Sequence, residues 1–118
     1  PDAGLHALRE VLAGRSERHH GDANFAMAVR YLLECLAELR PGNSVEVRVP
    51  PLGATQCIEG PTHRRGTPPN VIECDAQTWF AIAVGETSWQ DAVSGGRIRG
   101  SGTRADLSEV LPLNFGLN

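Results

Sequence analysis

The hydrophobic pattern of the chain changes its period near residue 42, and this change limits the folds that the chain can adopt. Steps of four and three residues, which are typical of a long amphipathic helix, separate the apolar residues Phe25, Val29, Leu32, Leu36 and Leu39. Pro41 and Gly42 end that pattern. The period is then two, as in a strand with one buried face, for the valines Val45, Val47 and Val49. A helix followed by a half-buried strand predicts an α+β fold.

Other helices are indicated by capping residues and apolar spacing. A short helix is expected over residues 5–12, and Asp75 can cap an apolar helix that runs to about Val84, where a glycine follows. Ser88 and Thr103 each stand three residues before an aspartate and precede apolar sets, which predicts two further short helices.

The remaining strand signals fall on short β-type segments. Residues 54–59 and 71–74 are separated by a loop rich in Gly, Pro and Thr, which favours a hairpin with a long loop, and residues 97–101 predict another strand. Consecutive strands followed by helices favour an antiparallel or mixed sheet with helices on one face. A length of 118 residues fits a single domain.

The C-terminal half carries a recognisable series of motifs. After the apolar helix come a short helix with Trp89, the glycines Gly95 and Gly96, the strand R-I-R-G-S-G at 97–102 and A-D-L-S-E-V-L-P-L at 105–113. This series resembles the C-terminal half of the sterol carrier protein 2 family. The segment at 60–73 is similar to that of short sterol-carrier-like proteins of actinobacteria. The resemblance covers roughly residues 44–113, after a helical N-terminal part at 1–42.

The resemblance implies a fold, a ligand class and one departure from the family. It implies a sheet of about five strands packed on helices. Between them, relatives have an apolar cavity or tunnel that holds sterols, fatty acyl chains or acyl-CoA. Relatives also have a helix over the tunnel mouth, where this chain has only L-P-L-N-F-G-L-N at 111–118.

Charge and hydropathy exclude some partner classes. The formal net charge of -3 gives no long-range attraction to a phosphate backbone, so nucleic acid is not an expected partner. No apolar run approaches the roughly 20 residues that span a bilayer, so stable membrane insertion is not expected either. We expect a cytoplasmic protein.

Catalytic and metal sites receive little support from the sequence. His19 and His20 are adjacent, and adjacent residues rarely converge on one ion, so a solvated loop is the preferred interpretation. Cys57 or Cys74 could form a nucleophile pair with His63, but no third group that would orient the histidine is evident. We therefore expect no catalytic residue, no metal and no cofactor.

Two sets of residues are candidates for ligand contact. The apolar set, called the predicted cavity residues below, is expected to line a cavity between sheet and helices and consists of Leu36, Val45, Val47, Val49, Trp79, Phe80 and Ile82. The basic set is His63, Arg64 and Arg65, whose arginine forks suit a phosphate or carboxylate headgroup.

The C-terminal residues alternate apolar side chains with Pro, Asn and Gly. An extended tail is therefore expected, with Leu113, Phe115 and Leu117 docked in a groove of the same chain or of a second copy, which makes a homodimer possible. The predicted function is non-enzymatic binding of a fatty acyl, acyl-CoA or sterol-like lipid. The alternatives are a protein-interaction module with a collapsed cavity, and an accessory domain related to the C-terminal domains of bacterial isomerases.

Overall fold

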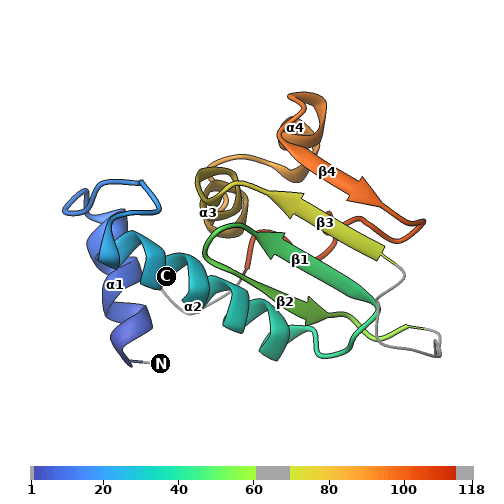
Figure 1. Ribbon diagram of the computed structural model, residues 1–118, viewed down its shortest axis with the longest axis horizontal. Helices are drawn as coiled ribbons and strands as arrows, with labels where there is room; N and C mark the ends of the chain where they lie inside the picture. Colours follow the sequence, from blue (N-terminus) through green and yellow to red (C-terminus); the bar gives the residue numbers. More distant parts are fainter. Residues whose placement is uncertain (1, 61–69, 114–118) are drawn as a thin grey trace.

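Helices and strands follow one another in the predicted order as far as the last strand. The computed structural model describes residues 2–60 and 70–113 (Figure 1). Its elements are α1 (Asp2–Leu12), α2 (Ala23–Leu39), β1 (Val45–Val49), β2 (Gly53–Cys57), β3 (Asn70–Cys74), α3 (Ala76–Val84), α4 (Trp89–Ser94) and β4 (Ile98–Ser101). His63, Arg64, Arg65, Phe115 and Leu117 lie outside the described residues.

Caps are present at the start of α2, α3 and α4, and those of α3 and α4 were predicted from the sequence. Asp22 accepts a hydrogen bond from the Phe25 backbone N–H, at 3.0 Å, at the start of α2. Asp75 and Ser88 cap α3 and α4 in the same way. Gly85 ends α3 with a left-handed backbone, φ 88°, which a residue with a Cβ rarely adopts. Asp75 and Ser88 therefore start α3 and α4, and Gly85 ends α3, where the sequence predicts.

The four strands form a mixed sheet in the order β2-β1-β3-β4. β1 pairs antiparallel with β2 and parallel with β3, and β4 is antiparallel to β3. The α+β class and mixed sheet are confirmed, and four strands are close to the number that the resemblance implies. The predicted hairpin between residues 54–59 and 71–74 is wrong, because β1 lies between these strands. The strands with the most buried side chains, β1 and β3, take the centre, and the poorly buried β2 forms an edge.

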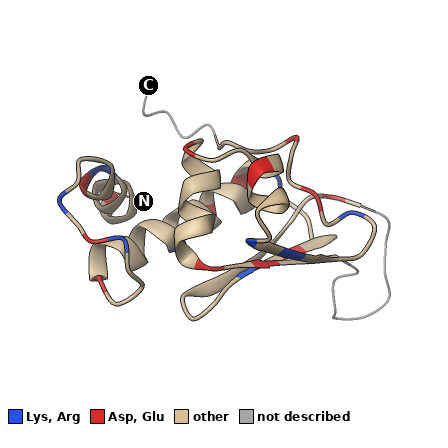
Figure 2. Ribbon diagram, turned by 90° about the horizontal axis from the view of Figure 1, so that it is seen from above, with Lys and Arg blue, Asp and Glu red and all other residues tan. Residues whose placement is uncertain are grey.

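The sheet has one face against the helices and one polar face. α3 and α4 lie on the same side of the sheet (Figure 2). The inward side chains of β1 are fully buried, whereas Glu46, Arg48, Glu73 and Arg99 alternate in charge on the opposite face. Ion pairs join Arg48 to Glu46 and Arg99 to Glu73. The hydrophobic core therefore lies between the sheet and α2 and α3.

The helix predicted from Thr103 onward is wrong. After β4, residues 102–113 form turns, and Asp106 accepts a hydrogen bond from the Ser108 backbone N–H at 2.8 Å. The Val110 and Leu111 N–H groups donate to the Leu107 carbonyl, which closes a single turn. Pro112 stops this turn from growing, because the residue before a proline is disfavoured in the helical region.

Candidate functional site

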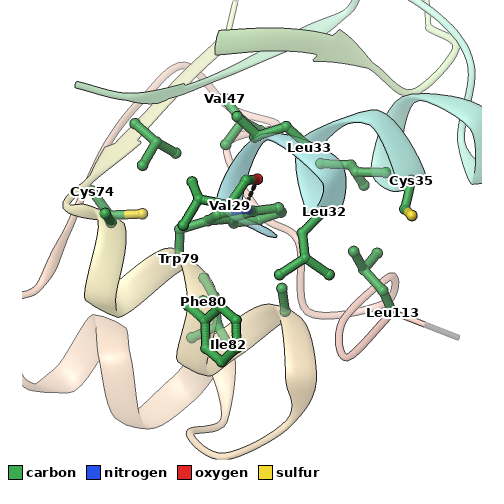
Figure 3. Packing of buried hydrophobic residues seen from close by; sticks show 14 of the residues in the cluster. Val29, Leu32, Leu33, Cys35, Val47, Cys74, Trp79, Phe80, Ile82 and Leu113 are labelled. Carbon is green, nitrogen blue, oxygen red and sulfur yellow. Dashed lines mark hydrogen bonds between the residues drawn. The ribbon is translucent and has the colours of Figure 1, made fainter. Parts of the chain in front are cut away.

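The predicted cavity residues all lie in one buried cluster. Each is at most 1% exposed. Figure 3 shows Trp79 of α3 between the sheet side, marked by Val47, and α2, marked by Val29 and Leu32. The Trp79 indole N–H donates to the Val29 backbone carbonyl at 3.2 Å, so its polar atom has a partner inside the core.

The interior around Trp79 is filled by side chains. Among the described residues, pockets open at the surface, and Ile82 is the predicted cavity residue that reaches one of them. That pocket has a volume of about 170 Å³, and Trp89, Leu111 and Pro112 also line it. The cavity-lining role of this set stays a prediction.

A larger depression lies at the C-terminal end of α2. Its main part has a volume of about 550 Å³ and is lined by Arg40, Ile58, Arg104, Asp106, Ser108, Glu109 and Val110. An adjoining part of about 290 Å³ shares some of these residues and adds Leu39, Leu111, Pro112 and Leu113. We call the two parts together the α2-end groove. Sequence reasoning did not find it, because its walls come from segments far apart in the chain.

One wall of the α2-end groove is apolar. Leu39 continues the stripe of Leu32 and Leu36, which are fully buried, yet its own side chain is 45% exposed. Opposite Leu39, the groove is lined by the apolar residues of 110–113. The buried stripe of α2 therefore runs into the groove and is left uncovered there.

The other wall is charged. Arg40 and Arg104 face the groove together with Asp106 and Glu109, and all four residues are exposed. Hydrogen bonds from Ser108 lower the pKa of Asp106. The bond from the Ser108 backbone N–H has the larger effect, and the bond from the Ser108 side chain has the smaller one. Within residues 2–60 and 70–113, no ion pair engages Arg40 or Arg104. Arg40 lines both parts of the groove, and Arg104 lines the main part.

Membership of a protein family is decided by residues 21–113, which match a profile described as bacterial SCP ortholog. The chain belongs to this family. Curated proteins give no match to the sequence. An SCP-like family points to a lipid-carrier role in general and is generally non-catalytic. In the part of the chain that the structure describes, no helix combines the length and apolar character needed to cross a membrane.

The match to bacterial SCP orthologs covers the groove and the sheet but not α1. α1 packs on α2, where Gly4 approaches Tyr31 so closely that a Cβ would lie 2.5 Å from the ring. Arg18, in the connection to α2, pairs with Glu86 at 2.6 Å and lies 4.6 Å above the centre of the Phe80 ring. The segment before the matched region is thus attached to both α2 and α3.

A buried polar cluster fixes the base of the SCP-like groove. The Asn70 side chain donates to the Ser44 carbonyl and accepts from the Arg104 backbone N–H, both at 2.8 Å. Ser44 in turn donates to the Ile58 carbonyl at 2.7 Å. Ser44 and Asn70 are 1% and 2% exposed. We call Ser44 and Asn70 the polar clamp, because they tie Ile58 and Arg104 of the groove to the sheet.

The sequence-predicted basic set is connected to the same place. His63, Arg64 and Arg65 are outside the described residues, but the residues that flank them, Gly60 and Asn70, are beside Arg104. A Cβ on Gly60 would lie 2.9 Å from the Arg104 guanidinium. The headgroup role of the basic set stays a prediction.

The cysteines are free and buried, and their chemistry is that of core residues. Burial raises the pKa of the Cys57 thiol to about 11. Burial also raises the pKa of Cys74, to about 12, with a smaller contribution from the adjacent carboxylates. Since the thiolate is the nucleophile, these groups are unreactive near neutral pH. His19 and His20 are exposed, and their rings stack 4.4 Å apart.

Proposed function

We propose that the protein is a non-enzymatic carrier that binds a fatty acyl, acyl-CoA or sterol-like lipid at the α2-end groove. The observation that carries this proposal is Leu39, whose side chain is 45% exposed although it continues the buried stripe of an SCP-like protein. Covering such a side chain by a ligand gains about 25 cal/mol for each Å² removed from water. The cell compartment that we propose is the cytoplasm.

The apolar part of the ligand would lie along Leu39 and residues 110–113. From there the apolar chain would point toward the interior between α2 and α3. Leu36 and Ile82 are two of the predicted cavity residues there. The lipid-carrier character of the family supports a site that extends inward. Ligand sites are commonly apolar with a few polar groups that fix orientation.

The polar end of the ligand would meet the charged wall. Arg40 and Arg104 offer planar donor groups that suit a carboxylate or phosphate. Arg64 and Arg65 would add to this site, since the described residues on either side of their segment, Gly60 and Asn70, lie beside Arg104. A fatty acid or an acyl-CoA meets both requirements, with an apolar chain and an anionic end.

Calorimetric titration with a fatty acid, an acyl-CoA and a sterol tests the proposal directly. Leu39→Asp should lower the affinity at least about tenfold, because it places a charge against the apolar chain. Met27→Asp is the matched control, since Met27 is an apolar residue of the same helix with 42% exposure and does not line the groove. Absence of heat with every ligand, or equal losses in both variants, would contradict the proposal.

A headgroup role for the arginines predicts a loss that depends on ligand charge. Replacing Arg40 and Arg104 by alanine should weaken the binding of an anionic lipid by about 1.5 to 3 kcal/mol for each lost charged hydrogen bond. The uncharged alcohol with the same chain should bind as before. Arg9→Ala, on α1, is the control. Equal weakening of the acid and the alcohol would contradict this role.

A second candidate is a protein-interaction module, and the filled interior around Trp79 favours it. In that case the groove would take a partner segment or the tail of a second copy, giving a homodimer. Sedimentation of the full chain and of a chain lacking residues 114–118 separates the two candidates. A dimer that dissociates on deletion supports the module, and an unchanged monomer that binds lipid supports the carrier. An accessory domain of an isomerase would instead co-purify with a catalytic partner domain.

A further inference from the structure

We propose that Leu113 limits the length of the apolar chain that the protein accepts, because it closes the passage from the α2-end groove to the interior. The proposal rests on the proposed function, since it concerns the apolar part of the same ligand. It follows from the position of Leu113, which belongs both to the groove and to the core.

Leu113 packs in the buried core and also lines the groove. It is 7% exposed and is part of the buried cluster between the helices and the sheet. It also lines the smaller part of the groove, together with Leu39 and Leu111. In Figure 3 its side chain points toward Leu32 and lies near Cys35 of α2. The predicted cavity residues do not line this part of the groove, whereas Leu113 both lines it and packs in their cluster.

Leu113 is attached to α3 by a backbone hydrogen bond and lies beside open pockets. Its backbone N–H donates to the Ala83 carbonyl at 2.9 Å, in the last turn of α3, where carbonyls lack partners inside the helix. Just before it, Leu111 and Pro112 line the groove and also the 170 Å³ pocket that holds Ile82. Open space near this segment allows the side chain to shift, which a close-packed interior does not.

The geometry gives a quantitative expectation for chain length. A chain that lies along Leu39 ends at Leu113, so methylenes beyond that point gain no burial. Leu113→Ala removes an isopropyl group and should make room for about three more carbons in the direction of Leu32. Each methylene newly removed from water strengthens binding about fourfold.

The test is a calorimetric series of saturated fatty acids from octanoate to palmitate on the full chain. In the wild type, affinity should rise with each methylene and then level off. In Leu113→Ala the plateau should come about three methylenes later, and the longest acids should gain about tenfold or more. Leu113→Val should move the plateau by about one methylene, and this variant replaces Leu113→Ala in the test if the alanine variant does not fold. Leu107→Ala is the matched control, because Leu107 is fully buried in the same segment and lines none of the pockets described above.

The outcomes separate this proposal from the proposed function. A later plateau in the Leu113 variants, with the wild-type plateau in Leu107→Ala, supports the proposal. Wild-type binding with an unmoved plateau in the Leu113 variants, or an equal shift in Leu107→Ala, overturns it and leaves the carrier function standing. If the wild type binds none of the acids, the role of Leu113 fails, and the titrations with acyl-CoA and sterol decide separately whether the carrier function stands.

Discussion

The interior around Trp79 and the α2-end groove are built on the same apolar stripe of α2, yet they differ in how the stripe is covered. Leu36 is fully buried, whereas Leu39, less than one helical turn further on, is 45% exposed. Over the interior, α3 and the sheet close on the stripe (Figure 3). At the groove, residues 104–113 do not cover the stripe, and the main part of the groove has a volume of about 550 Å³.

This difference separates stability from binding. Side chains that fill the interior contribute to the free energy of unfolding through close packing, and they are not available to a ligand until something moves. The groove contributes less to stability, because its side chains remain partly in water, and it is available to a ligand at once. Substitutions in the two regions should therefore have opposite profiles, with large effects on unfolding in one and large effects on binding in the other.

The largest effect is expected from Trp79→Ala. Trp79 is fully buried and hydrogen-bonded to α2, so the variant should lose about 3 to 5 kcal/mol in the free energy of unfolding. Leu39→Ala, in the groove, should lose less than about 1 kcal/mol, because nearly half of its side chain is already exposed. Urea unfolding followed by circular dichroism measures both. Similar losses in the two variants would mean that the groove is as tightly packed as the interior.

A smaller loss is expected from Asn70→Ala in the polar clamp. The substitution leaves the buried Ser44 carbonyl without its partner, which costs about 1 to 3 kcal/mol, whereas the part-buried Arg104 backbone N–H can turn to water. Urea unfolding gives the loss, and Gln56→Ala, at an exposed position of β2, is the control. The variant should also lose preference for anionic over uncharged lipids, because Arg104 is no longer held. Retained preference would show that the clamp serves the sheet alone.

The local parts of this fold were predictable from the sequence. Asp75 and Ser88 cap helices where their spacing to apolar residues indicates, because a cap depends on neighbours within one turn. Thr103 carries the same signal and fails, because other partners take the groups that would start the helix: the Arg104 N–H donates to Asn70, and Asp106 accepts from the Ser108 N–H. Capping signals are thus reliable only where no other partner takes the groups that start the helix.

Pairings between distant residues were not predictable. β3 pairs with β1 rather than with its neighbour β2, and no local pattern determines that choice. The groove depends on it, because Arg40 and Arg104 face one depression only after Asn70 has joined β3 to the last segment. The one sequence signal that pointed there was Leu39, the last residue of the helical stripe before Pro41 and Gly42.

Trp79 emission can tell whether a ligand stays in the groove or reaches the interior. Trp89→Phe leaves Trp79 as the single tryptophan, and its buried indole should emit at short wavelength. A chain that passes Leu113 should change this emission, whereas a ligand confined to the groove should leave it unchanged. The comparison of octanoate with palmitate in wild type and Leu113→Ala measures the difference. Equal changes with both acids in both proteins would contradict the separation of the two regions.

The smallest effect is expected at the Arg18–Glu86 pair, near the N-terminal end of α2, where an exposed ion pair joins the connection before α2 to the end of α3. The hydrogen bond from Arg18 lowers the pKa of Glu86, with a smaller coulombic contribution from the same residue. A carboxylate whose pKa is lower in the folded state adds stability that is present above its unfolded pKa and lost as the pH falls through the folded one. Both side chains are about 40% exposed, so solvent screens the pair and we expect only about 0.5 kcal/mol near neutral pH.

Glu86→Gln should therefore be slightly less stable than the wild type at neutral pH, and urea unfolding at decreasing pH should show the gap closing. Glu34→Gln, at an exposed position of α2 outside the described ion pairs, corrects for the lost charge. A gap that persists in acid would mean that Glu86 acts by packing and that this end of the molecule is closed in the same way as the interior.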